Sequence, residues 1–134
     1  MLLKLRAGEK LYINGAVIRV ERKATIELLN DATFLLEAHV IQPEEASTPL
    51  RQLYFVLQTE LMEREGAPMA RKVFRAMLAD TSEAFGPGAV ADGLSGVAAL
   101  AEAGRAFEAL KAIRSLYPLE ASLLSDKPRT PAAA

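Results

Sequence analysis

The sequence has 134 residues, contains no cysteine and carries a formal net charge of -1 at pH 7. A chain of this length is expected to form one domain that buries roughly two-thirds of its unfolded surface. No uninterrupted apolar run reaches the roughly 18 residues of a membrane-spanning helix, so a cytoplasmic protein is expected. The lack of cysteine excludes disulfides and thiolate metal sites.

The first part of the chain alternates between apolar and polar side chains, a pattern typical of β-strands. A turn at residues 7–9 predicts that the first two strands form a hairpin. Asn14-Gly15 predicts another hairpin, because both residues accept the positive φ angles of a type I′ turn. We expect an antiparallel meander or small barrel of four to five strands, over residues 3–6, 10–14, 16–21, 24–29 and 33–41.

Residues 42–49 join these strands to a part of the chain with helical spacing. Thr48 is expected to cap a helix with its hydroxyl, and Pro49 suits the first helical position, where its missing N–H leaves no hydrogen bond unmade. Glu44 and Glu45 precede this helix, and the positive N-terminal end of the helix dipole stabilises their negative charge. The joint, with a structural or partner-binding role, comprises Gln42, Pro43, Glu44, Glu45, Thr48, Pro49 and Arg51.

Beyond the joint, apolar residues recur at spacings of three and four. We expect three to four helices, over residues 48–64, 68–85, 89–103 and 105–117. The apolar stripe of the first helix consists of Leu50, Leu53, Tyr54, Leu57 and Leu61. Met69 and Val73 are expected on the buried face of the second helix, and Gly93 and Gly96 in the third permit close packing. The fold class predicted is therefore α+β.

The periodic pattern dissolves after Pro118. We therefore expect a single domain over residues 1–117, followed by a mostly disordered tail over residues 118–134. Within the domain, the predicted parts are a β half (1–41), the joint (42–49) and a helical half (50–117).

No catalytic apparatus is apparent in the sequence. His39 is the one histidine, and its alternation with apolar neighbours favours a solvated or packing role over catalysis. Glu37 lies two positions away, but no third ligand accompanies the pair, so a metal site is not expected. The segment Gly86-Pro87-Gly88 lacks the Lys-Ser or Lys-Thr that follows in a phosphate loop. We expect neither an enzyme nor a bound cofactor.

Positive charge is concentrated near the N-terminus. Residues 1–23 hold six cations against two acids, a net of +4, whereas residues 24–48 hold five acids and no lysine or arginine. Either the two blocks pair across strands as a solvated surface, or part of the sheet binds RNA phosphates while Tyr12 stacks on a base. The candidate RNA-binding residues are Lys4, Arg6, Lys10, Tyr12, Arg19, Arg22 and Lys23. A second basic cluster reads as an exposed helix face and comprises Arg71, Lys72 and Arg75.

Two groups of short motifs carry a family resemblance. One is the joint, in which Gln42-Pro43-Glu44-Glu45 precedes Thr48-Pro49, Arg51 and Tyr54-Phe55. The other is the series Leu3-Lys4-Leu5, Gly8-Glu9-Lys10 and Ile13-Asn14-Gly15-Ala16-Val17. In order and separation, these motifs resemble the FlbT family of bacterial flagellin-synthesis regulators over roughly residues 1–117, the helical half matching more by pattern than by motif.

The resemblance implies a small cytoplasmic post-transcriptional regulator without enzyme activity. Such a protein associates with the 5′ untranslated region of flagellin mRNA, affects its stability or translation, and couples flagellin synthesis to flagellum assembly. The resemblance also implies FlaF and flagellin as partners, and either repression or activation as the outcome. A second hypothesis is a protein-binding adaptor or chaperone-like factor that acts through FlaF or flagellin, with only an indirect effect on mRNA.

Overall fold

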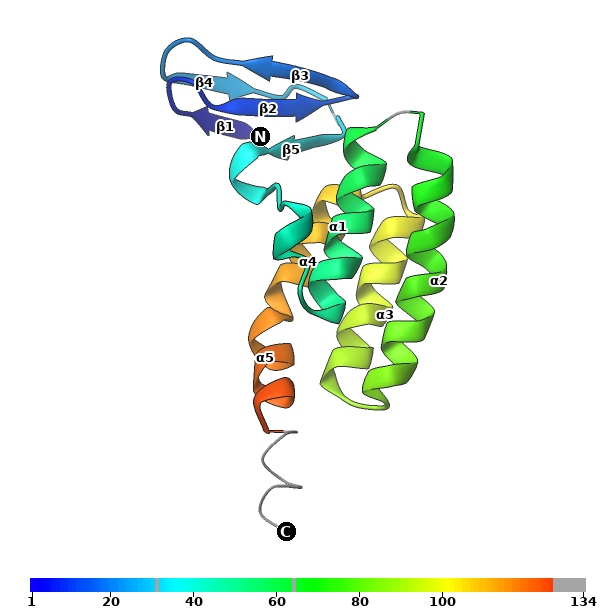
Figure 1. Ribbon diagram of the computed structural model, residues 1–134. Helices are drawn as coiled ribbons and strands as arrows, with labels where there is room; N and C mark the ends of the chain where they lie inside the picture. Colours follow the sequence, from blue (N-terminus) through cyan, green and yellow to red (C-terminus); the bar gives the residue numbers. More distant parts are fainter. Residues whose placement is uncertain (31, 64, 127–134) are drawn as a thin grey trace.

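The computed structural model describes residues 1–30, 32–63 and 65–126. Its strands are β1 (Leu2–Leu5), β2 (Lys10–Ile13), β3 (Ala16–Arg19), β4 (Ala24–Glu27) and β5 (Phe34–Leu36). Two short 3-10 helices, η1 (Glu37–His39) and η2 (Pro43–Glu45), lead to the α-helices. These are α1 (Pro49–Met62), α2 (Ala67–Phe85), α3 (Ala89–Glu102), α4 (Ala106–Ser115) and α5 (Tyr117–Asp126). The α+β order is confirmed, with the strands at one end of the helices (Figure 1).

The strands form two sheets, and β1 does not pair with β2. β1 pairs antiparallel with β4, while β2 lies between β3 and β5. The predicted hairpin of the first two strands is therefore wrong. Leu3 and Leu5 of β1 pack with Leu11 of β2 and Phe34 of β5 in one buried cluster. Stacked sheets bury both apolar rows against each other, whereas a hairpin would set them side by side on one face.

The Asn14-Gly15 turn between β2 and β3 is confirmed. Both residues have positive φ, 49° and 82°, and Ile13 pairs with Ala16 across the turn. The Asn14 N–H also donates to the Thr33 carbonyl at 2.7 Å, and the Asn14 side-chain oxygen accepts the Thr33 N–H at 3.1 Å. The turn therefore fixes the start of β5 as well as the hairpin.

The last strand is shorter than its pattern predicts. Residues 33–41 were expected to be extended, yet β5 ends at Leu36 and η1 follows. The carboxylate of Glu37 accepts the backbone N–H of Lys10 at 3.0 Å, so a side chain takes the place of the next ladder bond. Gln58 of α1 then holds the backbone of Ile41 through two hydrogen bonds of 2.8 Å. These contacts turn the chain toward α1.

The helical core is built around α1, which packs against α2, α4, α5 and β5. Its predicted stripe is confirmed, because all five members are buried: Leu50, Leu53, Tyr54, Leu57 and Leu61. Burial of each large side chain contributes roughly 1.5–3 kcal/mol relative to exposure. Thr48 caps the helix by accepting the Arg51 N–H at 3.3 Å, and Pro49 is its first residue, as predicted.

The buried face of α2 differs from the predicted one. Met69 and Val73 are 65% and 41% exposed, whereas Ala70, Phe74 and Thr81 are buried. The sequence offers two stripes at helical spacing, and the bulky Phe74 ring lies in the one that faces the core. The helix ends as expected before Gly86, which has a φ of 75°.

The chain remains helical after Pro118, where the pattern predicts a tail. Pro118 is the second residue of α5, a first-turn position at which its missing N–H costs nothing. The helix lacks an apolar stripe because its fully buried residue is an acid, Glu120. The rest of the predicted tail, residues 127–134, lies outside the described residues.

Gly93→Ala is expected to lower the free energy of unfolding by about 1 kcal/mol, because the new Cβ would lie 2.6 Å from a methyl carbon of Leu116. Gly96→Ala is the matched control in the same helix. Among the described residues nothing lies within 4 Å of the Cβ that Gly96→Ala adds, so this variant should raise stability by about 0.5–1 kcal/mol. Urea unfolding measures both variants. Equal stabilisation would contradict the close approach of α3 to Leu116.

Candidate nucleic-acid interface

Two connections meet at one end of the strands, the β1–β2 turn and the β3–β4 loop (Figure 1). The Gly8 N–H donates to the Val20 carbonyl at 2.7 Å, and the Val20 N–H donates to the Glu9 carbonyl at 3.1 Å. These bonds set side by side two segments that are far apart in the sequence. This end of the strands is named the basic corner, and its cations are Arg6, Lys10, Arg19, Arg22 and Lys23.

Within the basic corner, Lys10 and Arg19 lie directly opposite each other on β2 and β3. Like charges in this position repel and destabilise a sheet by up to about 1 kcal/mol. Three acids, Glu9, Glu21 and Glu37, share this end, and the carboxylates of Glu9 and Glu37 accept the backbone N–H groups of Arg6 at 2.9 Å and Lys10 at 3.0 Å. The fold therefore places two cations opposite each other, with Arg19 exposed and Lys10 half-buried.

Among the described residues, no side chain of the basic corner takes part in an ion pair. The helical arginines differ. Arg71 and Arg75, from the second predicted cluster, bind Glu60 and Glu102 at 2.8 Å. Similarly, Arg105 binds Glu108 at 2.5 Å. Ion pairs therefore neutralise some of the cations of the helices, whereas no described cation of the basic corner takes part in one.

The structure separates two other RNA-binding candidates from this corner. Lys4 alternates with the buried Leu3 and Leu5, so it lies on the outer face of the β1–β4 sheet. Tyr12 shares a sheet face with Lys10, but it is half-buried and packs against the helical core. Five of the seven candidates therefore lie at the basic corner, whereas the Tyr12 ring packs against the helical core.

The joint has a structural role in the described chain. Gln42 and Glu45 form a capping box around η2, in which the Glu45 carboxylate accepts the Gln42 N–H at 2.8 Å. Pro43 begins that turn, and Glu44 is exposed. The predicted start of α1 at Thr48 and Pro49 follows directly.

A buried polar cluster beside the joint is absent from the predicted sites. The Arg114 guanidinium donates to the Tyr54 hydroxyl at 2.8 Å, and that hydroxyl donates to the His39 carbonyl at 2.5 Å. Burial raises the pKa of Tyr54 and, more strongly, that of Tyr117. Glu120 completes the cluster by accepting the Leu50 N–H at 2.8 Å. A helical tyrosine at an apolar stripe position was the one sequence signal for this cluster.

His39 belongs to η1 and is partly buried. Burial and, to a smaller extent, the Arg114 charge lower the pKa of His39 below its usual value. Within residues 1–30, 32–63 and 65–126, no group of three His, Asp or Glu residues is placed to hold a metal ion. In the same part of the chain, no helix has the length and apolar character to cross a membrane.

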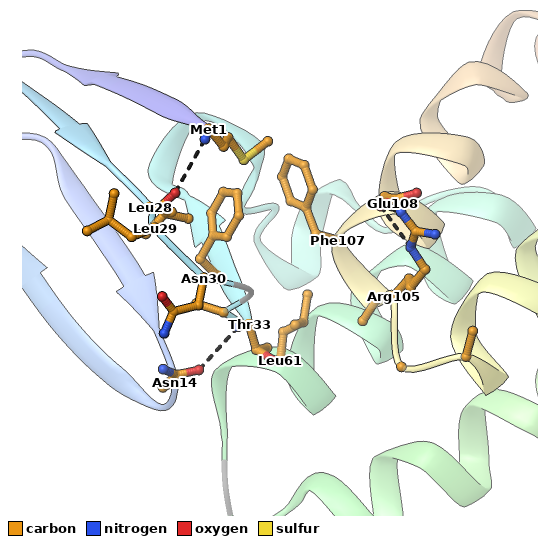
Figure 2. A pocket seen from close by; sticks show the side chains of 15 residues that line it. Met1, Asn14, Leu28, Leu29, Asn30, Thr33, Leu61, Arg105, Phe107 and Glu108 are labelled. Carbon is orange, nitrogen blue, oxygen red and sulfur yellow. Dashed lines mark hydrogen bonds and ion pairs between the residues drawn. The ribbon is translucent and has the colours of Figure 1, made fainter.

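An open groove of about 730 Å³ lies between the strands and the start of α4 (Figure 2). Phe34 and Phe107 form part of its wall, with ring centroids 4.5 Å apart. Met1 and Leu29 at its rim are 63% and 85% exposed. This apolar rim was not predicted, because its members come from segments more than 25 positions apart.

The chain is similar to proteins of one family over most of its length. A family model described as "Flagellar protein FlbT" matches residues 1–124. A relative from Chelativorans sp., "Probable flagellum biosynthesis repressor protein FlbT", is 51% identical over 123 residues, which cover 92% of this chain and 85% of that protein.

Relatives of the same name show similar agreement. The protein from Agrobacterium fabrum is 48% identical over 130 residues, covering 97% of this chain and 87% of its own. The protein from Brucella ovis is 51% identical over 126 residues, covering 94% and 83% respectively. No solved structure shows a significant match to the chain.

Acid is expected to destabilise the wild-type chain more than a His39→Gln variant between about pH 7 and pH 5. Because the folded-state pKa of His39 is lowered, the unfolded chain binds a proton more readily. The stability contributed by the neutral ring is therefore present above pH 6.5 and is lost as the pH falls through the folded-state pKa. Urea unfolding across this range measures the difference. Parallel pH curves for the two chains would contradict it.

Proposed function

The chain belongs to the FlbT family, and from this premise we propose that it binds the 5′ untranslated region of flagellin mRNA through its basic corner. Its curated relatives are named probable flagellum biosynthesis repressors, and that name supports a regulatory role in flagellum synthesis. In the proposal, the bound chain alters the stability or translation of the message and thereby represses synthesis. The chain carries out no catalytic step.

The observation that carries the proposal is the set of unneutralised cations at the basic corner. Three described arginines of the helices have carboxylate partners, and a fourth, Arg114, bonds to a tyrosine hydroxyl. The Lys10–Arg19 pair instead costs folding energy, a cost that binding a phosphate between the two side chains would remove. Like charges kept opposite each other in a sheet break a local rule of stability, and such exceptions are expected at functional sites.

The arrangement supports phosphate contacts more than base contacts. Lysine and arginine on exposed strand ends can each neutralise one RNA phosphate, releasing counterions. Five such contacts predict a fall in log affinity with log salt of slope about -3 to -4 on single-stranded RNA. Lys4 and Tyr12 contribute less in this proposal, because one lies on the other sheet and the other is half-buried.

The double substitution Lys10→Ala and Arg19→Ala is expected to weaken binding to flagellin leader RNA about 10- to 100-fold and to flatten the salt slope by about 1 to 2. Removing the repulsive pair should leave the free energy of unfolding unchanged or higher by up to about 1 kcal/mol. Filter binding at several salt concentrations and urea unfolding measure the two effects.

The matched control removes the same charge from the helices. Lys72 and Lys111 are exposed, so Lys72→Ala with Lys111→Ala changes the net charge equally while leaving the basic corner intact. This control should bind RNA nearly as tightly as the wild type. Equal losses in the two double variants would mean that only net charge matters and would refute the proposed site.

A second candidate function is favoured by the groove between the strands and α4. Exposed apolar side chains such as Leu29 at a groove mark a surface for a protein partner. The chain would then act as an adaptor for FlaF or flagellin, with an indirect effect on mRNA. Binding of leader RNA by the isolated chain would exclude an adaptor-only role.

Leu29→Ser is expected to weaken binding of purified FlaF or flagellin about 10-fold if the groove receives that partner. The side chain is 85% exposed, so the substitution should not alter stability. Leu123→Ser, on an exposed position of α5 remote from the groove, is the control. Calorimetric titration measures both variants, and unchanged affinity in Leu29→Ser would remove the groove from consideration.

A further inference from the structure

Strand β3 has an open and apolar edge. All four of its residues, Ala16–Arg19, are exposed, whereas each of the other described strands contains buried or half-buried residues. Two neighbouring apolar side chains of β3, Val17 and Ile18, are 59% and 40% exposed. Among the described strands, β3 pairs only with β2, so it forms one edge of its sheet (Figure 1). Such an edge is a template for pairing with a strand of another chain.

The backbone groups of Val17 and Arg19 point away from β2. Along an antiparallel pair, residues that exchange both backbone hydrogen bonds with their opposite neighbour alternate with residues that exchange none. Val20, directly after β3, bonds to the β1–β2 turn through both its N–H and its carbonyl. By this alternation, the next residue of β3 that bonds to β2 is Ile18. The N–H and carbonyl groups of Val17 and Arg19 therefore face the open edge.

The open edge of β3 is complementary to itself. When two copies run antiparallel with Ile18 opposite its own counterpart, Val17 of each copy lies opposite Arg19 of the other. These two pairs can then exchange four backbone hydrogen bonds. Ile18 lies opposite the buried Leu11 and on the same sheet face, so the paired isoleucines would extend that apolar row.

The charges of β3 favour this register of the two copies. A cation on an edge strand usually protects the edge from pairing, and a register centred on Arg19 would set two guanidinium groups opposite each other. In the register centred on Ile18, Arg19 instead faces the neutral Val17 of the second copy. The alkyl part of the arginine side chain can pack on this valine while the guanidinium group remains in solvent.

The same register brings two basic corners together. Lys10 and Arg19 lie opposite each other on one sheet face, so their counterparts in the second copy would lie on the continuation of that face. The two Arg19 residues become diagonal neighbours, which lie about 7–8 Å apart and within reach of each other's long side chains. An RNA phosphate placed between them would offset their repulsion. The paired copies therefore present four cations where one copy presents two.

We infer that β3 is a dimer interface, in which a second copy pairs about a two-fold axis at Ile18, and that RNA binds across both basic corners of the dimer. The second half of this inference rests on the proposed function. A four-residue edge is a small contact, and interfaces below about 1,200 Å² are typical of weak complexes, so the free dimer dissociates in the micromolar range. RNA strengthens the dimer, because RNA binding and dimerisation are reciprocally coupled.

Charged substitutions at Ile18 test the position of the two-fold axis. At about 100 μM chain, the wild type should sediment mainly as a dimer, whereas Ile18→Lys and Ile18→Glu should each be monomeric. An equimolar mixture of the two variants should dimerise again, because each lysine then faces a glutamate across the axis. Sedimentation equilibrium without RNA measures all four samples. A monomeric wild type, or a mixture that stays monomeric, would overturn the inference.

A backbone substitution keeps the inference testable if the Ile18 variants do not fold. Val17→Pro removes an N–H that faces the open edge and leaves the bonds to β2 in place, so the fold should be retained. Its dimer dissociation constant should rise about 10- to 100-fold, because the dimer loses one hydrogen bond from each copy. Val17→Thr, the matched control, retains the N–H and the β-branched shape and should dimerise like the wild type. Equal dimerisation of the two variants would overturn the inference.

RNA affinity separates this inference from the proposed function. Val17→Pro changes no charge, yet it should bind flagellin leader RNA about tenfold more weakly than Val17→Thr, because it lacks the cations of a second copy. Equal RNA affinities of these two variants would overturn the inference and leave the basic corner of the single chain as the proposed site. Unchanged RNA affinity after Lys10→Ala with Arg19→Ala would instead overturn the proposed function and the RNA half of the inference.

Discussion

Burial of Leu3 and Leu5 against Leu11 and Phe34 decides how the strands of this protein are arranged. Because these side chains must face one another, β1 leaves its neighbour in sequence and pairs with β4. The same stacking sets the β1–β2 turn beside the β3–β4 loop and leaves Lys4, Arg6 and Arg19 exposed. The basic corner is thus a product of hydrophobic packing in the strands, and no ion pair among the described residues is needed to build it.

The cations of the helices and those of the strands differ in their partners. On the helices, Arg71 and Arg75 bind carboxylates, Arg114 binds a tyrosine hydroxyl, and the fully buried Glu120 supports the start of α1. Surface ion pairs of this kind contribute little stability, typically up to about 1 kcal/mol, but they neutralise part of the positive charge of the helices. No described cation of the strands takes part in an ion pair, so their positive charge remains available to an anionic ligand.

The features that the sequence predicts correctly depend on residues that are close to one another in the chain. The Thr48 cap, the stripe of α1 and the Asn14-Gly15 turn each depend on residues within a few positions, and each is confirmed. Pairing of β1 with β4, the choice between two stripes on α2 and the helicity of α5 depend on distant contacts. The acid Glu120 has its partner 70 positions away, so an apolar pattern cannot reveal it. The candidate cations were identifiable, but their gathering at one corner required the topology.

We propose that the cations of the basic corner form the RNA-binding surface. Backbone amide chemical shifts, followed while flagellin leader RNA is added to the full-length chain, test it most directly. We expect the largest perturbations at residues 6–10 and 19–23, with α2 and α3 little changed. Perturbations centred on α2 and α3, with the basic corner unaffected, would contradict it.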